Sequence, residues 1–321
     1  NTDTRDAKET ISQIHALEKE GCDIIRVAVP DIEAALSIRE IKNNISIPLI
    51  ADIHFDYRIA IKAIEMGADK IRINPGNIGS AERVKSVVSC ANERGIPIRV
   101  GVNAGSLEKR IAEKYGGIKP EALGGSAENN IGILEDIGFY DIVVSIKSSN
   151  VPLMIAAYEL ISEKTEYPLH IGVTEAGTPY RGTIKSAVGI GALLSRGIGD
   201  TIRVSLTADP SEEVRAGKEI LKSLGLYRYG PEFISCPTCG RTRINLVSVA
   251  EQVEKALEGI EKPLKIAVMG CEVNGPGEAK EADIGIAGGD GCALLFKKGE
   301  IIRKISEEKI VEELINEINN M

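Results

Sequence analysis

The chain has 321 residues, of which 43% are hydrophobic and 27% are charged. Its 47 acidic residues outnumber its 39 basic ones, and the net charge of −8 argues against nucleic acid or an anionic membrane surface as the main partner. No apolar run reaches the length of a membrane span, no signal peptide is visible, and six cysteines are too few for a disulfide scaffold. We therefore expect a cytoplasmic protein.

From the start of the chain to about residue 228, short β-branched runs alternate with amphipathic stretches of helical period. The runs that we expect to form strands are 22–30, 47–55, 69–75, 96–103, 141–148, 168–175 and 200–207. The expected helices between them include 31–43, 80–94 and 182–196, and the longer segment 104–138 carries an insertion. Alternating β and α units of this kind make a parallel sheet.

The first 228 residues are predicted to form a (β/α)₈ TIM barrel that binds the substrate. Seven strands are one short of the eight that close such a barrel, so we expect the first strand upstream of Asn1. No G-x-G-x-x-G follows the first visible strand, which argues against a dinucleotide-binding fold. Residues 229–321 form a second unit of changed composition, predicted to be a small α+β domain. Its expected strands are 264–269, 283–287 and 292–297, and its expected helices are 249–259 and about 307–319.

Two cysteine-containing motifs organise this second unit: S-C-P-T-C-G-R at 235–241 and M-G-C-E-V-N-G-P-G-E at 269–278. The spacing of Cys236 and Cys239 lets two thiolates converge on one metal, and Cys271 adds a third soft ligand. A disulfide, a structural zinc and an iron–sulfur cluster all fit this pattern, and we favour the cluster. Its fourth ligand is either Cys292 or Glu278, and the residues alone leave that choice open.

Five cationic residues interrupt the predicted barrel strands. Arg26, Arg72, Arg99 and Arg203 each stand between branched aliphatic residues, and Lys147 follows Ile146 in a comparable place. Because an unpaired buried cation is costly, five of them require a common explanation. We expect them to converge at the C-terminal mouth of the barrel on a polyanion such as a diphosphate, which arginine grips in a bidentate manner. The alternative is a set of structural salt bridges with neighbouring carboxylates.

Polar residues follow the same strands and fit the same picture. The residues at or near these strand ends are Asp52, His54, Asn74, Asn103, Thr174, Glu175 and Ser205. Glu175 is the best candidate for a general acid or base, because neighbouring charges in a cationic, partly dry pocket can tune a carboxylate.

The two cysteine motifs, together with I-R-I-N-P-G-N-I-G, R-V-G-V-N-A-G-S-L, S-I-K-S-S and I-R-V-S-L-T, resemble the GcpE family of 4-hydroxy-3-methylbut-2-enyl diphosphate synthases. The resemblance implies a [4Fe–4S] cluster held by Cys236, Cys239, Cys271 and Glu278, so that Cys292 is not a ligand. It also implies a role for Glu175 in protonation near the ring. The implied diphosphate contacts are Arg26, Arg72, Arg99, Asn103, Lys147, Arg203 and Ser205.

The resemblance further implies an iron–sulfur oxidoreductase of the non-mevalonate isoprenoid pathway. Such an enzyme reduces 2-C-methyl-D-erythritol 2,4-cyclodiphosphate with electrons from ferredoxin or flavodoxin, in a homodimer in which the cluster domain of one subunit caps the barrel of the other. The runner-up hypothesis is a pterin-binding barrel methyltransferase or synthase with a structural zinc. A third, non-catalytic hypothesis is a metal-stabilised interaction module, which leaves the strand arginines without a purpose.

Overall fold

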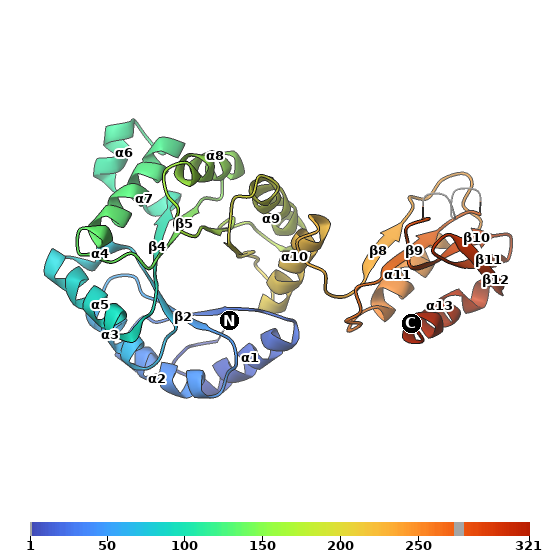
Figure 1. The fold of residues 1–321 in the computed structure, drawn as a ribbon, viewed down its shortest axis with the longest axis horizontal. Coiled ribbons are helices and arrows are strands. Elements are labelled where there is room, and N and C mark those ends of the chain that lie inside the picture. Colours follow the sequence, from blue (N-terminus) through green and yellow to red (C-terminus); the bar gives the residue numbers. More distant parts are fainter. Residues whose placement is uncertain (1, 273–278) are drawn as a thin grey trace. The chain divides into compact units, whose positions relative to one another are not determined.

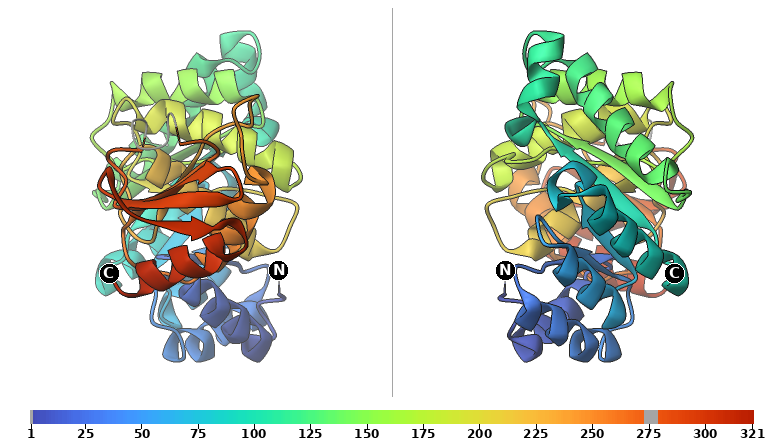
Figure 2. Two further views of the ribbon diagram at one scale, coloured as in Figure 1. Left: turned by 90° about the vertical axis from the view of Figure 1, so that its right-hand side faces the viewer. Right: turned by 90° about the vertical axis from the view of Figure 1, so that its left-hand side faces the viewer.

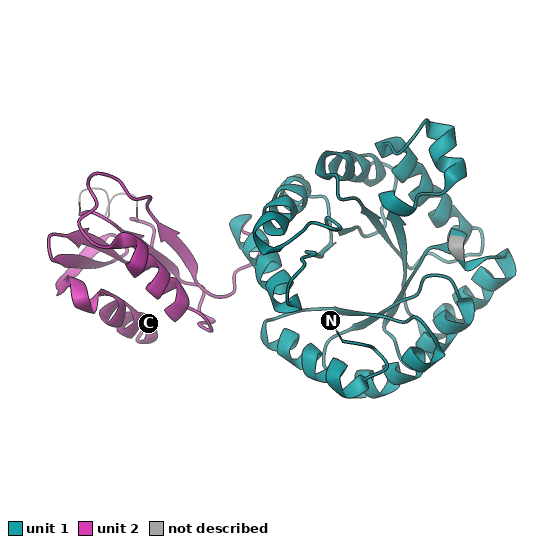
Figure 3. Ribbon diagram, turned by 180° about the vertical axis from the view of Figure 1, so that it is seen from behind, with its two compact units in different colours: residues 1–224 teal, residues 225–321 magenta. Residues whose placement is uncertain are grey.

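The computed structural model describes residues 2–272 and 279–321, and the chain divides into two compact units, residues 1–224 and 225–321 (Figure 3). The sequence placed the boundary slightly later, after residue 228. Among the helices in these described ranges, none is long and apolar enough to cross a membrane.

Unit 1 is built on parallel strands. They are β1 (Ile25–Ala28), β2 (Leu49–Asp52), β3 (Lys70–Ile73), β4 (Ile98–Asn103), β5 (Ile142–Lys147), β6 (His170–Ile171) and β7 (Thr201–Ile202). The first five form one sheet in chain order, and β6 pairs with β7 in a second. A single bridge from Val144 to Leu169 continues the order from β5 toward β6.

Helices connect these strands and surround them in a ring (Figure 1). They are α1 (Ala7–Lys19), α2 (Ile32–Asn43), α3 (Tyr57–Glu65), α4 (Pro75–Ile78), α5 (Ala81–Arg94), α6 (Lys109–Tyr115), α7 (Pro120–Glu135), α8 (Val151–Ser162), α9 (Pro179–Leu194) and α10 (Pro210–Ser223), with a 3-10 turn at Ala104–Ser106. Six of them begin at a side chain that accepts a backbone N–H of the first turn, which satisfies a donor that the helix itself leaves free. These capping residues are Asp6, Asp31, Asp56, Asn74, Asn150 and Asp209.

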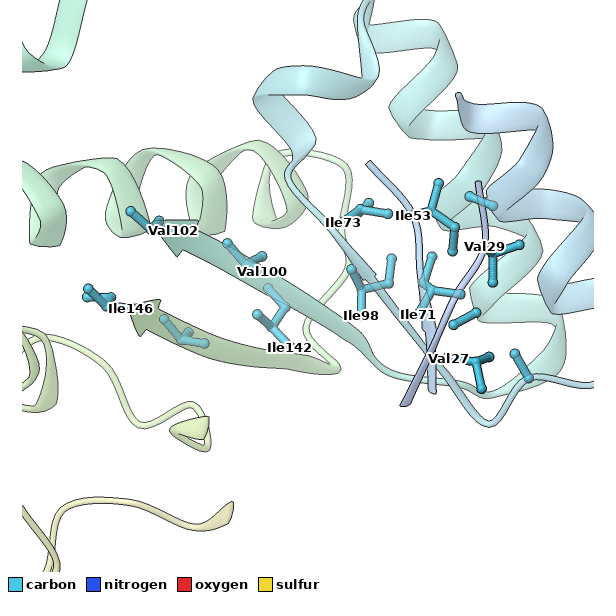
Figure 4. Close-up of a cluster of buried hydrophobic side chains, with 14 of the residues drawn as sticks. Val27, Val29, Ile53, Ile71, Ile73, Ile98, Val100, Val102, Ile142 and Ile146 are labelled. Atoms are coloured by element: carbon cyan, nitrogen blue, oxygen red, sulfur yellow. The ribbon is translucent and has the colours of Figure 1, made fainter. Parts of the chain in front are cut away.

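Alternation along the strands separates two faces of the barrel wall. Branched side chains such as Ile71, Ile73, Ile98 and Val100 are fully buried and belong to the cluster of apolar side chains drawn in Figure 4. Because successive side chains of a strand point to opposite faces, the intervening positions point to the other face of the wall. This alternation explains how a cation can interrupt an apolar strand without entering the apolar core.

A tyrosine bridges β5 and β6 where the regular ladder has ended. The Tyr158 hydroxyl on α8 accepts the Ile146 N–H at 2.8 Å and donates to the His170 carbonyl at 2.6 Å. The Tyr158 side chain is fully buried. One hydroxyl thus satisfies two backbone groups that have no strand partner, which keeps the two sheets adjacent at this position.

Unit 2 is a five-stranded mixed sheet in the order β12-β11-β10-β9-β8. Its strands are β8 (Glu232–Ser235), β9 (Lys265–Met269), β10 (Ile284–Gly289), β11 (Cys292–Lys297) and β12 (Glu300–Ser306), and its helices are α11 (Leu246–Ala256) and α13 (Ile310–Asn319), with a 3-10 turn at Glu307–Lys309. Buried residues of both helices, among them Val253 and Leu314, belong to one apolar cluster with residues of the sheet. Figure 2 (left) shows α13, in red, alongside the strands of this sheet.

The architecture expected from the sequence is confirmed: a parallel βα barrel precedes a small α+β unit. Two strands of unit 2, β8 and β12, were not predicted. The eighth barrel strand expected upstream of Asn1 stays a prediction.

Candidate functional site

The strand register brings the cationic residues of the barrel together. Asp52, Arg72 and Arg99 are direct neighbours across β2, β3 and β4, and Lys147 pairs with Asn103 across β4 and β5. Together they line a cavity of about 220 Å³. Its lining residues are Arg26, Asp52, His54, Arg72, Arg99, Asn103, Ser145, Lys147, Thr174 and Arg203. All five strand cations therefore share one cavity.

Asp52 is the ion-pair partner of two of these cations. Its carboxylate lies 3.2 Å from Arg26 Nη1 and 3.2 Å from Arg72 Nη1. Burial alone would raise the pKa of the Asp52 carboxyl, but the two guanidinium groups hold it below its ordinary value. The salt-bridge alternative is therefore correct for part of the set, and Asp52 orients two arginines inside the cavity.

Arg99 has no ion-pair partner within residues 2–272 and 279–321. Its side chain is only 3% exposed, and its Nε is a buried donor without a hydrogen bond. Burial, followed by the nearby Arg26, lowers the pKa of Arg99 to about 9, so the group stays cationic at neutral pH. A buried hydrogen-bond donor normally has an acceptor. Leaving a charged donor without an acceptor costs more free energy than a typical hydrogen bond contributes to stability. An anionic ligand would satisfy it.

Arg203, which directly follows β7, is the fifth cation that lines the cavity. Burial, with Arg26 as the next cause, lowers the pKa of Arg203 to about 10. Its guanidinium donates to the hydroxyl of Ser205, and the Leu206 N–H donates to Glu213 Oε1 at 2.8 Å. Four arginines and one lysine face a single aspartate in this cavity, so its net charge is strongly positive.

Lys147 lies beside a histidine that the sequence did not single out. The Lys147 Nζ is 3.5 Å from His170 Nε2, and His170 Nδ1 is 2.8 Å from Thr201 Oγ1. Both side chains are buried. Burial, reinforced by the surrounding cations, holds the pKa of Lys147 and that of His170 well below their ordinary values.

The remaining predicted barrel residues occupy different positions. His54 lies at the rim, half-exposed, with Nδ1 3.4 Å from Arg72 Nη1. Asn103 lines the cavity, whereas Asn74 and Ser205 do not. The amide oxygen of Asn74 accepts the Gly76 N–H and caps α4, and the Ser205 hydroxyl accepts from Arg203. In this structure both are oriented toward the protein itself.

Glu175 follows β6 in an exposed loop, with a backbone φ of 51°. That left-handed conformation is uncommon for a residue with a side chain, and such strain is concentrated at functional sites. The preceding Thr174 lines the cavity and donates its N–H to the Ser148 carbonyl at 3.3 Å. Glu175 therefore lies one residue from the cavity wall.

Three cavity features were missed from the sequence. Ser145 and His170 lie inside predicted strands that looked apolar, and Gly101 on β4 makes room for a guanidinium, as shown below. The only sequence signal for His170 was its position. It is a polar residue two positions after a proline, within a predicted strand of branched residues.

The cysteine motifs lie at the same end of the unit 2 sheet. β8 and β9 are parallel neighbours, with Ser235 opposite Val268, so Cys236 and Gly270 follow side by side. The Gly270 N–H donates to Cys236 Sγ at 3.2 Å, and the Arg243 N–H donates to the Gly270 carbonyl at 2.9 Å. Backbone hydrogen bonds thus tie the loop with Cys236 and Cys239 to the loop with Cys271.

The local environment of these cysteines suits a thiolate-bound metal group. The N–H of Arg241, with its side chain, lowers the pKa of the exposed Cys239 thiol, and the Cys239 N–H donates to Thr242 Oγ1 at 3.1 Å. Cys271 is buried, and all six cysteines are free, so the disulfide alternative is not seen. Within residues 2–272 and 279–321, no three His, Cys, Asp or Glu side chains already stand together as a metal site. Glu278 lies outside these described ranges.

These features define a class: a parallel βα barrel with a cationic cavity, followed by a small α+β domain with two cysteine-bearing loops at one end of its sheet. Residues 1–218 match the GcpE TIM-barrel domain, and residues 232–320 match the GcpE protein C-terminal domain. The chain therefore belongs to the GcpE family, as its motifs predicted.

Curated relatives agree over the full length. A 4-hydroxy-3-methylbut-2-en-1-yl diphosphate synthase (flavodoxin) of Caldanaerobacter subterraneus subsp. tengcongensis is 66% identical over 321 residues, covering all of this chain and 90% of the relative. The protein of the same name from Clostridium acetobutylicum is 64% identical, covering all of this chain and 92% of the relative. Among solved structures, Yersinia pestis dihydropteroate synthase aligns with a TM-score of 0.47 and 13% identity, over 68% of this chain and 89% of that one. The names of the full-length curated relatives support the GcpE interpretation over the pterin-binding alternative.

Proposed function

We propose that this protein catalyses the reductive ring opening of 2-C-methyl-D-erythritol 2,4-cyclodiphosphate to (E)-4-hydroxy-3-methylbut-2-enyl diphosphate. The reaction consumes two electrons and two protons and releases one water. The full-length similarity to relatives named for this product supports the proposal. The cationic cavity supplies the chemical reason, because a diphosphate is the kind of ligand its unpaired cations require.

In this proposal the cavity binds the diphosphate and offsets the charge that develops when the ring opens. Arg99 and Arg203 contact phosphate oxygens directly, and Asp52 keeps Arg26 and Arg72 oriented before the substrate arrives. Pre-orientation matters because cations already in place need no reorganisation when the bond breaks. Asn103 and Lys147 complete the phosphate contacts, and His54 closes the rim.

Glu175 is proposed to donate a proton near the ring, which assists the loss of the hydroxyl as water. Its position in the loop after β6, one residue beyond the cavity-lining Thr174, supports this role. A positioned carboxyl group is one of the side chains that can transfer a proton to a leaving group.

A [4Fe–4S] cluster is proposed to bind Cys236, Cys239 and Cys271, with Glu278 as the fourth ligand. The tie between the two cysteine loops and the lowered pKa of Cys239 support thiolate ligation. When bound, such a cluster supplies the low-potential electrons that protein side chains cannot carry. Cys292, on β11, is left as a non-ligand.

Flavodoxin is proposed as the electron donor, because the relatives are named for it. We further propose that the protein acts as a homodimer, in which each subunit contributes a barrel and a cluster domain. In verified mixed dimers, a Cys236→Ser chain and a Glu175→Ala chain then restore activity that neither has alone. Mixed dimers without activity contradict this arrangement.

The observation that carries the proposal is the buried, unpaired Arg99. If Arg99 serves a ligand, its charge destabilises the empty protein, so Arg99→Met is expected to raise the free energy of unfolding and to abolish pyrophosphate binding. If Arg99 is structural, the same change lowers stability. The measurements are urea unfolding and calorimetric titration with pyrophosphate, followed by turnover of the cyclodiphosphate by the anaerobically reconstituted enzyme with reduced flavodoxin.

The matched control is Arg58→Met, because Arg58 is an exposed arginine paired with Asp56 outside the cavity. It is expected to leave pyrophosphate affinity and turnover unchanged. A reconstituted wild-type enzyme that binds pyrophosphate but leaves the cyclodiphosphate unchanged would refute the proposed reaction and leave an anion-binding barrel.

A further inference from the structure

A chain of three polar side chains crosses β5, β6 and β7 behind the phosphate cavity. Lys147 ends β5, His170 begins β6 and Thr201 begins β7. The Nζ of Lys147 lies 3.5 Å from His170 Nε2, and His170 Nδ1 lies 2.8 Å from Thr201 Oγ1. Lys147 is 6% exposed and His170 is 9% exposed. Neither contact involves a carboxylate.

The surroundings of Lys147 are cationic on nearly every side. Among the described residues that line the cavity, the only carboxylate is that of Asp52, which is already paired with two arginines. The charged and titratable groups that face Lys147 across the cavity are Arg26 on β1, Asp52 and His54 on and after β2, Arg72 on β3, Arg99 on β4, His170 on β6 and Arg203 after β7. An ammonium at this position would be buried among like charges, which is among the costliest arrangements in a protein.

We propose that Lys147 is an uncharged amine in the ligand-free cavity, that His170 is the positioning residue that holds it there, and that a bound diphosphate converts it to an ammonium by proton uptake from solvent. In that step an N–H bond forms on Nζ with a proton taken from water or buffer, and no electron changes hands. The proposal deepens the proposed function, on which it rests, and adds His170 to its site.

Because Lys147 is a donor, its contact with His170 requires Nε2 as the acceptor, and Thr201 Oγ1 can accept the Nδ1–H of that tautomer. When Nδ1–H donates to Thr201 Oγ1, the lone pair of Nε2 points toward Lys147 Nζ. The amine and the later ammonium can both donate to that lone pair, so the same contact holds Lys147 before and after protonation. A neutral imidazole is suited to this role because a charged one would repel the ammonium.

The direction of both titrations agrees with this geometry. Burial first, and then the neighbouring cations, hold the pKa of Lys147 and of His170 far below their ordinary values. A diphosphate brings opposite charge to the same place and so favours the ammonium. Its binding is then linked to uptake of about one proton, and affinity falls by about tenfold per pH unit wherever the free amine is neutral.

The test uses the full-length protein and pyrophosphate as the probe. Calorimetric titrations in buffers of different ionisation enthalpy count the protons exchanged on binding. Because pyrophosphate itself titrates, the relevant quantity is the difference between the wild type and Lys147→Met. We expect that difference to be about one proton between pH 6.5 and 8.5.

A pair of His170 variants tests the positioning role. In His170→Gln the longer amide reaches the place of Nε2 and can still accept from Lys147, whereas in His170→Asn the shorter amide reaches only the place of Nδ1, beside Thr201. We expect His170→Gln to bind pyrophosphate as the wild type does and His170→Asn to bind about tenfold more weakly, the cost of one charge-assisted hydrogen bond. Thr201→Val should also weaken pyrophosphate binding. This variant takes the place of His170→Asn in the test if His170→Asn does not fold.

The outcomes distinguish a failure of the inference about Lys147 and His170 from a failure of the phosphate site on which it rests. Equal proton counts for the wild type and Lys147→Met, with pyrophosphate bound, overturn the uncharged lysine and leave the phosphate site standing. Equal affinities for the glutamine and asparagine variants, with Thr201→Val unchanged as well, overturn the role of His170. A wild type that binds no pyrophosphate overturns the phosphate cavity and this inference with it.

Discussion

Gly101 on β4 provides the space in which the guanidinium of Arg72 lies. A Cβ atom at Gly101 would lie 2.5 Å from Arg72 Nε and 2.8 Å from its Nη2, closer than two such atoms can approach. Arg72 comes from the neighbouring strand β3 and donates to Asp52 at 3.2 Å. The missing side chain on β4 therefore lets a buried arginine extend along the barrel wall toward its aspartate.

Gly101→Ala is expected to displace the guanidinium of Arg72 and to weaken pyrophosphate binding by about 10- to 100-fold, the loss of one or two charge-assisted hydrogen bonds. Calorimetric titration measures this. The matched control is Gly132→Ala on α7, where an added Cβ meets nothing within 4 Å. Unchanged affinity in Gly101→Ala would mean that Arg72 does not contact the ligand.

Tyr158→Phe removes the hydroxyl that bridges Ile146 and His170. Two buried backbone groups then lose their partner, so we expect the free energy of unfolding to fall by about 2–4 kcal/mol. The measurement is a urea unfolding curve followed by far-ultraviolet circular dichroism. Tyr180→Phe is the control, because Tyr180 is 79% exposed. A Tyr158→Phe protein as stable as wild type would show that the two sheets do not depend on this bridge.

Most of the barrel could be predicted from sequence because its periodic signals are strong. The apolar faces of α2 and α5 repeat at helical spacing, and the side chain of Asp31 caps the first turn of α2. The strands β8 and β12 were missed for physical reasons. β8 is short and directly precedes the cysteine motif, and β12, at the sheet edge, alternates poorly because Ile301 and Ile302 are both exposed.

The cavity was predictable in part. A charged residue inside an apolar strand is easily noticed in the sequence. Because parallel strands of a barrel end on the same side, charged residues near those ends lie close together. The orientation of Asn74 and Ser205 was not predictable, since each has found a partner within the protein. The roles of His170 and Gly101 depend on contacts between different strands, which no local pattern in a single strand encodes.

The buried histidine should also make stability depend on pH. Burial, reinforced by the surrounding arginines, holds the pKa of His170 well below 6.5, so below pH 6.5 the unfolded chain binds a proton that the folded protein does not. Stability therefore falls as pH drops through 6.5, by up to about 1.4 kcal/mol per pH unit, until the folded histidine itself titrates. Urea unfolding between pH 5 and 7 measures the slope. In His170→Gln this part of the pH dependence of the free energy of unfolding should disappear. An unchanged slope would mean that other groups cause the pH dependence.

Cysteine-to-serine variants distinguish the cluster ligands from Cys292. Cys236, Cys239 and Cys271 lie on two loops joined by the hydrogen bond from Gly270 to Cys236, whereas Cys292 begins β11 opposite Gly289. After anaerobic reconstitution, Cys236→Ser, Cys239→Ser and Cys271→Ser are expected to lose most of their iron and acid-labile sulfide. Serine replaces a soft thiolate by a hard and poorly ionised oxygen, which holds such a cluster weakly.

Cys292→Ser is the matched control for this series and should retain iron, sulfide and the broad absorption near roughly 400 nm that a thiolate-bound cluster gives. Iron and sulfide analysis of all four variants, purified in parallel with circular dichroism to confirm folding, measures the difference independently of turnover. Loss of the cluster in Cys292→Ser would make Cys292 the fourth ligand in place of Glu278. A wild type that takes up zinc and no sulfide would instead make the three cysteines a structural metal site.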